Sequence, residues 1–251
     1  MSIATPLSPM VEKLGRRAAL TEVDRDALSS LPHRISEVDR DRYFAREGDR
    51  AGHCCVLISG FAMRHKITGD GARQIVAIHV PGDLLDAQNG ATDYSVTNGQ
   101  SLTGVRTAII ARSALLELAD AHPSIALALW ADAGANASIL AEWLLNIGRR
   151  DARSRIAHLL CEVKLRQEGM SHPSNACASW LMTQEQLGDA TGLTSIHVNR
   201  TIQGLRREGL LGYQQRELQI LDWDGLCQVG DFTPDYLLLD APEAQAPAPV
   251  H

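Results

Sequence analysis

The stretch that decides the fold is LMTQEQLGDATGLTSIHVNRTIQGLRREGLL, residues 181–211. Thr183 and Gln186 have the spacing of a capping box, in which the threonine caps a helix start and the glutamine reaches back to the backbone. Leu187 belongs to the inner face of this first helix. Gly192 then permits the tight turn that joins two crossing helices. The stretch therefore predicts a helix-turn-helix pair.

The second helix of the pair has two different faces. Thr194 can cap its start. Val198, Ile202 and Leu205 recur at spacings of 4 and 3, so they share one side of the helix and we expect them to be buried. The other side begins with groups that can reach base edges, as the first residues of a recognition helix do in the major groove. The predicted base-facing residues are Ser195, Ile196, Asn199 and Arg200.

The residues after the pair, GLLGYQQRELQILD, predict two short strands about a polar turn, which is a wing. Residues 149–216 contain ten Arg and Lys against six Asp and Glu, a difference of +4 inside a chain whose net charge is -6. A basic module within an acidic protein is the electrostatic pattern expected of DNA contact. Arg206, further along the outer face of the second helix, and Arg216, in the turn of the wing, are expected to contact the DNA backbone. A winged helix used only for protein contacts is the alternative.

Short strand patterns occupy the region from about residue 33 to residue 110. CCVLISGFAMRHKI is interrupted by Gly60, and TGDG at 68–71 predicts a hairpin turn, because glycine supplies the positive φ that tight turns need. ARQIVAIHV is the expected return strand, and SLTGVRTAIIA is a further strand rich in β-branched residues. Many short strands at this spacing predict an antiparallel sandwich or barrel. With the helices that follow, the predicted fold class is α+β.

A helical period begins at residue 112, and Pro123 suits the first turn of a long helix. One set of side chains then recurs at spacings of 4 and 3, which predicts a helix over 122–148 with a helix–helix seam. Asn136 favours a dimeric coiled coil over packing on the domain's own core, because a polar seam residue can fix register and partner number. The predicted dimer-interface residues are Leu129, Ala133, Asn136, Leu140, Trp143 and Ile147.

Composition limits the other classes of protein. The chain has 251 residues, of which 45% are hydrophobic, enough for one or two domains with real cores. The sequence contains no run of about 18 apolar residues, so no membrane span is predicted. Its first residues lack the pattern of a signal peptide, so we expect a cytoplasmic protein without a membrane partner. The five cysteines are odd in number and lack a framework spacing, which predicts reduced thiols. No catalytic or metal-binding motif occurs, so neither an enzyme nor a metal site is predicted.

Residues 181–211 resemble the helix-turn-helix of the Crp/Fnr family of bacterial transcription regulators, and the order of the preceding parts is similar too. REGD, VLISGF, TGDG and VPGDLLD stand where turns and strands of that family's β-roll would. The resemblance implies a double-stranded β-helix, or jelly roll, like a cyclic-nucleotide-binding domain. It implies the following division: N-terminal arm 1–20, sensor domain 21–121, dimerisation helix 122–148, winged helix-turn-helix 149–232 and flexible tail 233–251.

The resemblance also implies a function and residue roles. Thr183 and Thr194 are similar to helix-start residues that hold phosphates, and His197 stands where a backbone-contacting threonine is common, so all three are expected to contact the DNA backbone. Arg200 matches the family's arginine that reads guanine, whereas Ile196 stands where well-known members carry glutamate, which implies a different base at that step. The implied function is a sequence-specific regulator that binds a pseudo-palindromic promoter site in double-stranded DNA as a homodimer. RNA polymerase would be a partner of an activator. The alternative is a small-ligand sensor or interaction protein whose winged helix no longer reads DNA.

The sensor turn departs from the family pattern. Members that bind cyclic AMP carry a Gly-Glu-Leu turn and, soon after, an arginine that clasps the phosphate. This chain has Gly82, Asp83 and Leu84, and no arginine between 83 and 105. A cyclic phosphate would therefore meet carboxylates without a compensating cation, which argues against a cyclic nucleotide. The three turn residues remain the candidate effector pocket, and the effector itself is unknown.

Other cofactors have little support in the sequence. Members that hold an iron–sulfur cluster use several N-terminal cysteines, and no cysteine precedes Cys54. Haem or a single metal at His53, His65 and His79 stays open as an alternative to core thiols and surface histidines. No cofactor is predicted.

Overall fold

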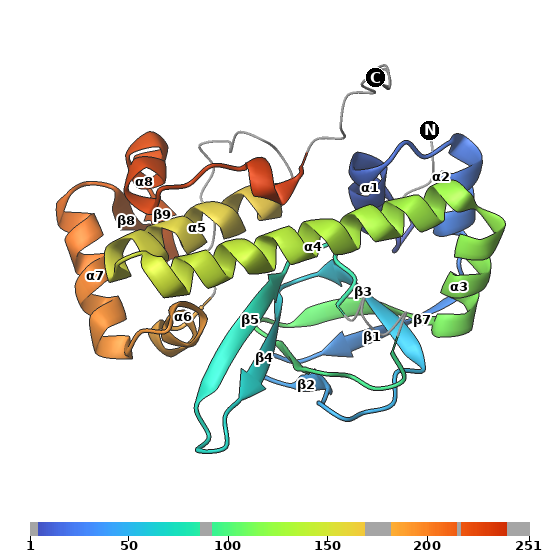
Figure 1. Ribbon diagram of the computed structural model, residues 1–251, viewed down its shortest axis with the longest axis horizontal. Coiled ribbons are helices and arrows are strands. Elements are labelled where there is room, and N and C mark those ends of the chain that lie inside the picture. The colour runs from blue at the N-terminus through green and yellow to red at the C-terminus, as the bar shows by residue number, and fades with distance from the viewer. Residues whose placement is uncertain (1–4, 86–91, 169–181, 215–216, 240–251) are drawn as a thin grey trace, which may run out of the picture.

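The computed structural model describes residues 5–85, 92–168, 182–214 and 217–239 (Figure 1). Two short helices, α1 (Ser8–Arg17) and α2 (Glu22–Ser29), precede a β-roll. The strands of the β-roll are β1 (His33–Val38), β2 (Tyr43–Ala45), β3 (His53–Ser59), β4 (Ala62–Ile67), β5 (Arg73–His79), β6 (Asn98–Ser101) and β7 (Val105–Ala111). The helices α3 (Arg112–Ala121), α4 (Pro123–Arg149) and α5 (Ala152–Glu168) follow.

The β-roll consists of two antiparallel sheets, with strand orders β1-β7-β3 and β2-β6-β4-β5. The TGDG segment joins β4 to β5 as predicted, and Gly71 has the positive φ of +92° that the turn requires. Side chains from both sheets, such as Leu57 and Met63, are fully buried. The prediction of an α+β protein with an N-terminal jelly roll is confirmed.

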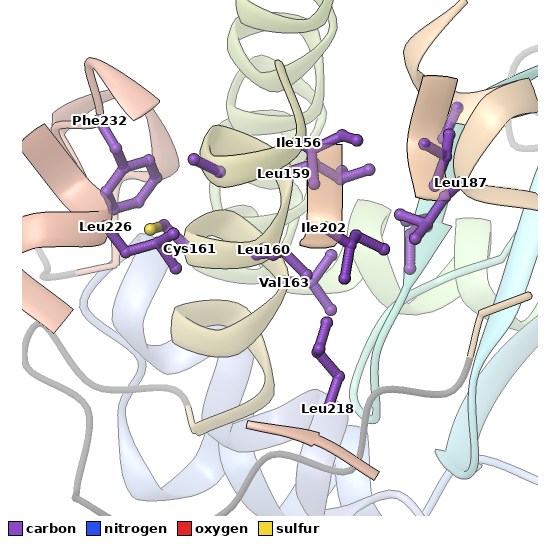
Figure 2. Close-up of a cluster of buried hydrophobic side chains, with 14 of the residues drawn as sticks. Ile156, Leu159, Leu160, Cys161, Val163, Leu187, Ile202, Leu218, Leu226 and Phe232 are labelled. Carbon is purple, nitrogen blue, oxygen red and sulfur yellow. The ribbon is translucent and has the colours of Figure 1, made fainter. Parts of the chain in front are cut away.

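The C-terminal module contains the helix-turn-helix pair α6 (Gln184–Thr191) and α7 (Ser195–Arg207), the wing strands β8 (Leu211–Gln214) and β9 (Glu217–Ile220), and α8 (Trp223–Gly230). Its side chains share one buried cluster with the β-roll: Met63, Ile75 and Ile78 lie in the same cluster as α5 and α7. Figure 2 shows the part of this cluster around α5. The two modules are therefore packed against each other rather than joined only by a linker.

Helix α4 runs along the molecule, from the N-terminal helices to the C-terminal module (Figure 1). Its inner face packs on its own chain through Ile125, Ala128, Asp132, Ala135, Ile139, Trp143 and Asn146. Trp143, which the sequence placed in a dimer seam, thus belongs to the protein's own core. Of the other seam residues, Leu129, Asn136 and Ile147 are half-buried, and only Ala133 and Leu140 are exposed. The predicted dimer-interface residues therefore lie along the border between the buried and the exposed faces of α4.

The exposed face of α4 carries a second stripe with heptad spacing. Leu127, Trp130 and Leu144 are 62%, 80% and 73% exposed. The small residues Gly134, Ala137, Ala141 and Gly148 are exposed on the same stripe. Spacings of 3 and 4 from residue 127 to residue 148 make this face a complete a/d seam. The sequence pattern missed it, because alanine and glycine do not stand out among the helix's many small residues.

Helix α4 is also long and apolar enough to cross a membrane, as no other helix in the described part of the chain is: it has 27 residues and a mean hydropathy of 1.3 in its most apolar stretch. The expected lack of such a segment was thus stated too strongly, since alanines raise the mean without forming an unbroken apolar run. Asp132 lies on its inner face, paired with Lys13 at 2.8 Å. The helix therefore packs as part of a folded protein.

Both ends of the described chain are more ordered than the sequence indicated. The expected arm contains α1, whose buried Met10 and Leu14 lie in a cluster with residues of α4. The expected tail contains a 3-10 turn, η2 (Asp235–Leu237), in which Leu237 is fully buried. Buried apolar side chains at helical spacing hold α1 and η2 against the rest of the protein. The Pro/Ala-rich part of the predicted tail, 240–251, lies outside the described residues.

Candidate nucleic-acid interface

The predicted caps and turn form the helix-turn-helix pair. Thr183 Oγ1 accepts a hydrogen bond from the Gln186 amide at 3.1 Å, and Gln186 Oε1 accepts one from the Thr183 amide at 2.9 Å. Gly192 ends α6 with a φ of +68°. Thr194 Oγ1 accepts from the His197 amide at 3.3 Å and caps α7. Backbone groups at both helix starts are therefore satisfied by side chains, which fixes where the helices begin.

Close backbone contact holds the two helices at their crossing. A Cβ atom on Gly188 would lie 2.4 Å from the carbonyl oxygen of Leu193, so only glycine fits there. The inner face of α7 is buried as predicted, through Val198, Ile202 and Leu205. The opposite face is thereby presented outward at the end of the molecule that is farthest from the N-terminal helices (Figure 1).

The four predicted base-facing residues share one exposed hollow. Ser195, Ile196, Asn199 and Arg200 line it, together with Gln184. Asn199 Nδ2 donates to Gln184 Oε1 at 3.2 Å. Ile196 is 71% exposed, so its apolar side chain is accessible to a partner in this hollow.

Gln184 was not singled out from the sequence, although a signal for it exists. It is the first residue of α6, next to the capping threonine, and the crossing of the helices brings this position beside α7. Its amide can donate and accept at once, as adenine requires.

The expected backbone contacts lie in different settings. Thr183, Thr194 and His197 are exposed around the helix starts. The Arg206 guanidinium lies 4.7 Å from the centre of the Tyr213 ring, which connects α7 to the wing by a cation–π contact. Arg216 lies outside the described residues.

Much of the positive charge counted in the sequence is used inside the protein. Arg150 pairs with Glu142 at 2.7 Å, and Arg166 pairs with Asp83 at 3.0 Å. Three more basic side chains, Arg153, Arg155 and Lys164, bind Glu208, backbone carbonyls and Glu168. The cations that α7 exposes are Arg200, Arg206 and Arg207. Fewer basic side chains are therefore available to bind DNA than the charge difference of +4 suggests, and those that are exposed on α7 lie on one helix.

The predicted effector turn is a structural element in this fold. Gly82 has a φ of +94°, and a Cβ there would lie 2.7 Å from the carbonyl oxygen of Pro9. The Asp83 carboxylate is buried between Lys13 and Arg166, each at 3.0 Å. Burial raises the pKa of Asp83, but attraction to these two cations outweighs burial and holds the pKa well below its usual value. Its charge is thus already neutralised by its own chain.

A cavity of about 320 Å³ lies between the β-roll and α4. Its apolar wall includes Val76 and Ile139, and its polar wall includes Arg64, Lys66 and Arg166. These cations come from β4 and α5 rather than from the loop between 83 and 105; Lys66 pairs with Glu47, and Arg166 pairs with Asp83 and Glu162. The expectation that no cyclic nucleotide binds was based on the loop between 83 and 105 alone, and it stays a prediction.

The histidines considered for haem or a metal are scattered. Within the described residues, no group of three His, Cys, Asp or Glu side chains has the arrangement of a metal site. His65 is fully buried with its ring edge-on to Tyr43, whereas His53 is exposed. His79 is buried and its Nδ1 lies 3.1 Å from Asp83. Burial lowers the pKa of His79 to about 4, so this imidazole is neutral at pH 7.

A chain of polar contacts connects the β-roll turn with the DNA-binding module. From Asp83 it passes through Arg166 to the buried Glu162 at 3.2 Å. Glu162 also accepts from Trp143 Nε1 of α4 and from the Tyr236 hydroxyl, each at 2.9 Å. Separately, Arg73 of β5 pairs with Asp189 of α6 at 2.7 Å. Contacts of this kind set the relative position of the two modules.

A β-roll connected by a long helix to a winged helix-turn-helix defines a DNA-binding transcription regulator. Residues 35–122 match the model of the cyclic nucleotide-binding domain, and residues 154–229 match that of the Crp-like helix-turn-helix domain. Together the two matches cover more than half of the chain. The chain belongs to the Crp/Fnr family of bacterial transcription regulators.

Individual relatives agree with this assignment. The nitrogen fixation regulation protein FixK of Azorhizobium caulinodans is 31% identical over 157 residues, which cover 62% of this chain and 62% of that protein. The transcriptional activator protein anr of Pseudomonas aeruginosa is 25% identical over 211 residues, 83% of this chain and 85% of that one. The structure of FixK2 from Bradyrhizobium japonicum has the same fold, with a TM-score of 0.71 over 79% of this chain and 98% of that one at 24% identity.

Proposed function

We propose that this regulator binds a two-fold symmetric DNA site as a cytoplasmic homodimer, with α7 of each protomer in the major groove. The observation that carries the proposal is the exposed hollow at the start of α7, where Arg200, Asn199 and Ile196 point outward from a helix whose other face is buried. Arginine can bind guanine through a fork, asparagine can read adenine, and isoleucine can contact a thymine methyl group. The proposal includes no catalytic step.

The dimer in this proposal forms along the exposed stripe of α4. Leu127, Trp130 and Leu144 leave large apolar surfaces in water, and the small residues between them allow a second helix to approach closely. Two copies related by a two-fold axis would bury the same stripe on both chains. The dimer places two recognition helices for half-sites about one helical turn apart.

Regulation in this proposal acts on the contacts between the modules. A ligand in the cavity beside α4 would contact Arg166, which also binds Asp83 of the β-roll turn. Such a ligand changes DNA affinity only by the difference between its affinities for the two arrangements of the modules. An activator of this kind would then contact RNA polymerase.

We expect Arg200→Ala to weaken binding to the specific site by about 1 to 3 kcal/mol and to relax the preference at one guanine in each half-site. The reason is the loss of the forked contact to the guanine edge. Competition binding against sites altered at single positions measures both effects. Arg106→Ala is the matched control, because it removes the same charge from an exposed position on β7. If both variants lose the same amount of DNA affinity, Arg200 contributes only general electrostatic attraction and does not read a base.

Selection of DNA from a random duplex pool tests the proposed function as a whole. The full-length protein, at stated salt and without added ligand, is expected to recover a two-fold symmetric motif. The motif should contain a guanine at the Arg200 step and lack a cytosine preference at the Ile196 step, since isoleucine cannot accept a hydrogen bond from a cytosine amino group. Weak, salt-sensitive binding without enrichment, both alone and with candidate anionic ligands, would instead support a winged helix that serves a protein partner.

A further inference from the structure

Two thiols of the DNA-binding module lie face to face. Cys161 of α5 and Cys227 of α8 are both free, and their sulfur atoms are 3.8 Å apart. Figure 2 shows the Cys161 sulfur on the side of the cluster where Leu226 and Phe232 lie. The other described cysteines, Cys54 and Cys55, belong to the β-roll. Neither the fold nor DNA recognition explains why two sulfurs should be opposite each other.

The backbone geometry favours a bond between these sulfurs. A Cβ atom on Gly230 would lie 2.7 Å from the amide nitrogen of His158, so α5 and α8 are already as close as two backbones come. Each cysteine lies three residues from this contact, forward along α5 and backward along α8. The two helices are thus antiparallel at this point, and the thiols face each other across the same interface. A disulfide has an S–S distance of about 2.05 Å, so formation of the bond requires the two sulfurs to approach each other from 3.8 Å to that distance.

The two thiols differ in access and acidity. Cys161 is fully buried, whereas Cys227 is partly exposed. Burial raises the pKa of the Cys161 thiol well above its usual value. The hydrogen bond with Cys161 lowers the pKa of Cys227. Since the thiolate is the reactive form, Cys227 is the sulfur that an oxidant in water meets first, and Cys161 is the partner behind it.

We propose that Cys161 and Cys227 are a reversible redox site, which closes to an intramolecular disulfide when the protein meets a peroxide. The Cys227 sulfur attacks one peroxide oxygen, the O–O bond breaks, and the products are a sulfenic acid and water. The Cys161 sulfur then attacks the Cys227 sulfur, and the hydroxyl group leaves with the Cys161 proton as a second water molecule. Two thiols are oxidised to one disulfide and one hydrogen peroxide is reduced to two waters. A small thiol reductant reverses the reaction.

A disulfide between Cys161 and Cys227 closes a loop of the chain that contains the DNA-reading elements. The loop between residues 161 and 227 contains α6, α7 and the wing. The bond therefore restrains unfolding of this whole module, because it limits the unfolded chain. The helices need not move, so the oxidised protein keeps its native fold and gains thermal stability.

The test uses the full-length protein with equimolar hydrogen peroxide. Digestion without reductant, followed by mass spectrometry, is expected to yield one joined pair of peptides, containing residues 161 and 227 and two hydrogens lighter than the separate thiol peptides. Dithiothreitol should release the pair. The Tm of the oxidised protein should rise by at least about 5 °C. Oxygen addition at Cys227 without a joined peptide, or a bond from Cys227 to Cys177, would overturn the proposal.

Variants separate this site from the other thiols. Cys227→Ser alters the partly exposed member of the pair, and it should abolish both the joined peptide and the rise in Tm. Cys55→Ser and Cys177→Ser are the matched controls, and both should retain the two effects. A Cys227→Ser protein that still gains the same Tm on oxidation would show that the stabilisation arises elsewhere. Circular dichroism of each reduced variant establishes that it is folded before the comparison.

Discussion

The Asp83→Asn variant is expected to lose about 3 kcal/mol of its free energy of unfolding at pH 7. The side chain keeps its shape but loses its charge, so the half-buried Lys13 and the largely buried Arg166 side chain have one carboxylate fewer between them. The folded pKa of Asp83 lies below its unfolded value, so the charged form stabilises the protein at neutral pH and this contribution is lost only in acid. Urea unfolding at pH 7 measures the loss in full.

Two comparisons identify the cause of that loss. Asp93→Asn removes the same charge from a side chain that is 84% exposed and pairs with Arg112, and it should cost no more than about 0.5 kcal/mol. Arg166→Met should cost less stability in the Asp83→Asn background than in the unaltered protein, because one of the two carboxylates that Arg166 contacts, Asp83 and Glu162, has then already lost its charge. If the double variant is less stable than Asp83→Asn by the full cost of Arg166→Met alone, the two groups do not interact and the buried pair is not the source.

Trp130→Glu is expected to prevent formation of the proposed homodimer and to weaken binding to a two-fold symmetric site by about 10²- to 10⁴-fold. Trp130 is the most exposed large apolar side chain of the α4 stripe, and aromatic residues contribute most to such interfaces. A carboxylate at this position would face its own copy across the two-fold axis. Light scattering gives the oligomeric state, and DNA titration gives the affinity.

The controls distinguish the exposed stripe from the seam that the sequence predicts. Leu116→Glu changes an exposed leucine on α3 and should leave a dimer. Leu140→Lys alters a side chain of the sequence-predicted seam that lies beside the stripe and should weaken the dimer less than Trp130→Glu. A dimer that persists in Trp130→Glu but dissociates in Leu140→Lys would place the contact on the sequence-predicted seam after all.

Local signals along the chain were sufficient for the DNA-binding helices. Thr183, Gly192 and Thr194 determine the ends of α6 and α7 by hydrogen bonds within three or four residues, so their spacing alone identifies the motif. The buried stripe of α7 is likewise periodic in the sequence. The strands around TGDG were predictable for the same reason, since a hairpin is a local structure.

Long-range contacts were not predictable from these signals. Trp143 satisfies the heptad pattern and yet donates to Glu162 inside the protein, because the position of α5 decides which stripe of α4 is covered. Asp83 had the place of a ligand-binding acid and instead pairs with Lys13 from α1, a residue 70 positions away. The charge count over residues 149–216 was misleading because it left out acids beyond that range: Arg166 pairs with Asp83, and Arg150 pairs with Glu142 and Asp231.

The contact between Arg17 and the last described turn has a consequence for the ends of the polypeptide. The Arg17 guanidinium donates to the carbonyl oxygens of Leu237, at 2.7 Å, and of Leu238, while it also pairs with Asp132 of α4. The first helix and the last turn thus share one cation. Chain ends are ordinarily where fraying and proteolysis begin. Here neither α1 nor the turn at residues 235–239 can detach without leaving part of the other uncovered, so removal of one of them should make the other sensitive to proteases.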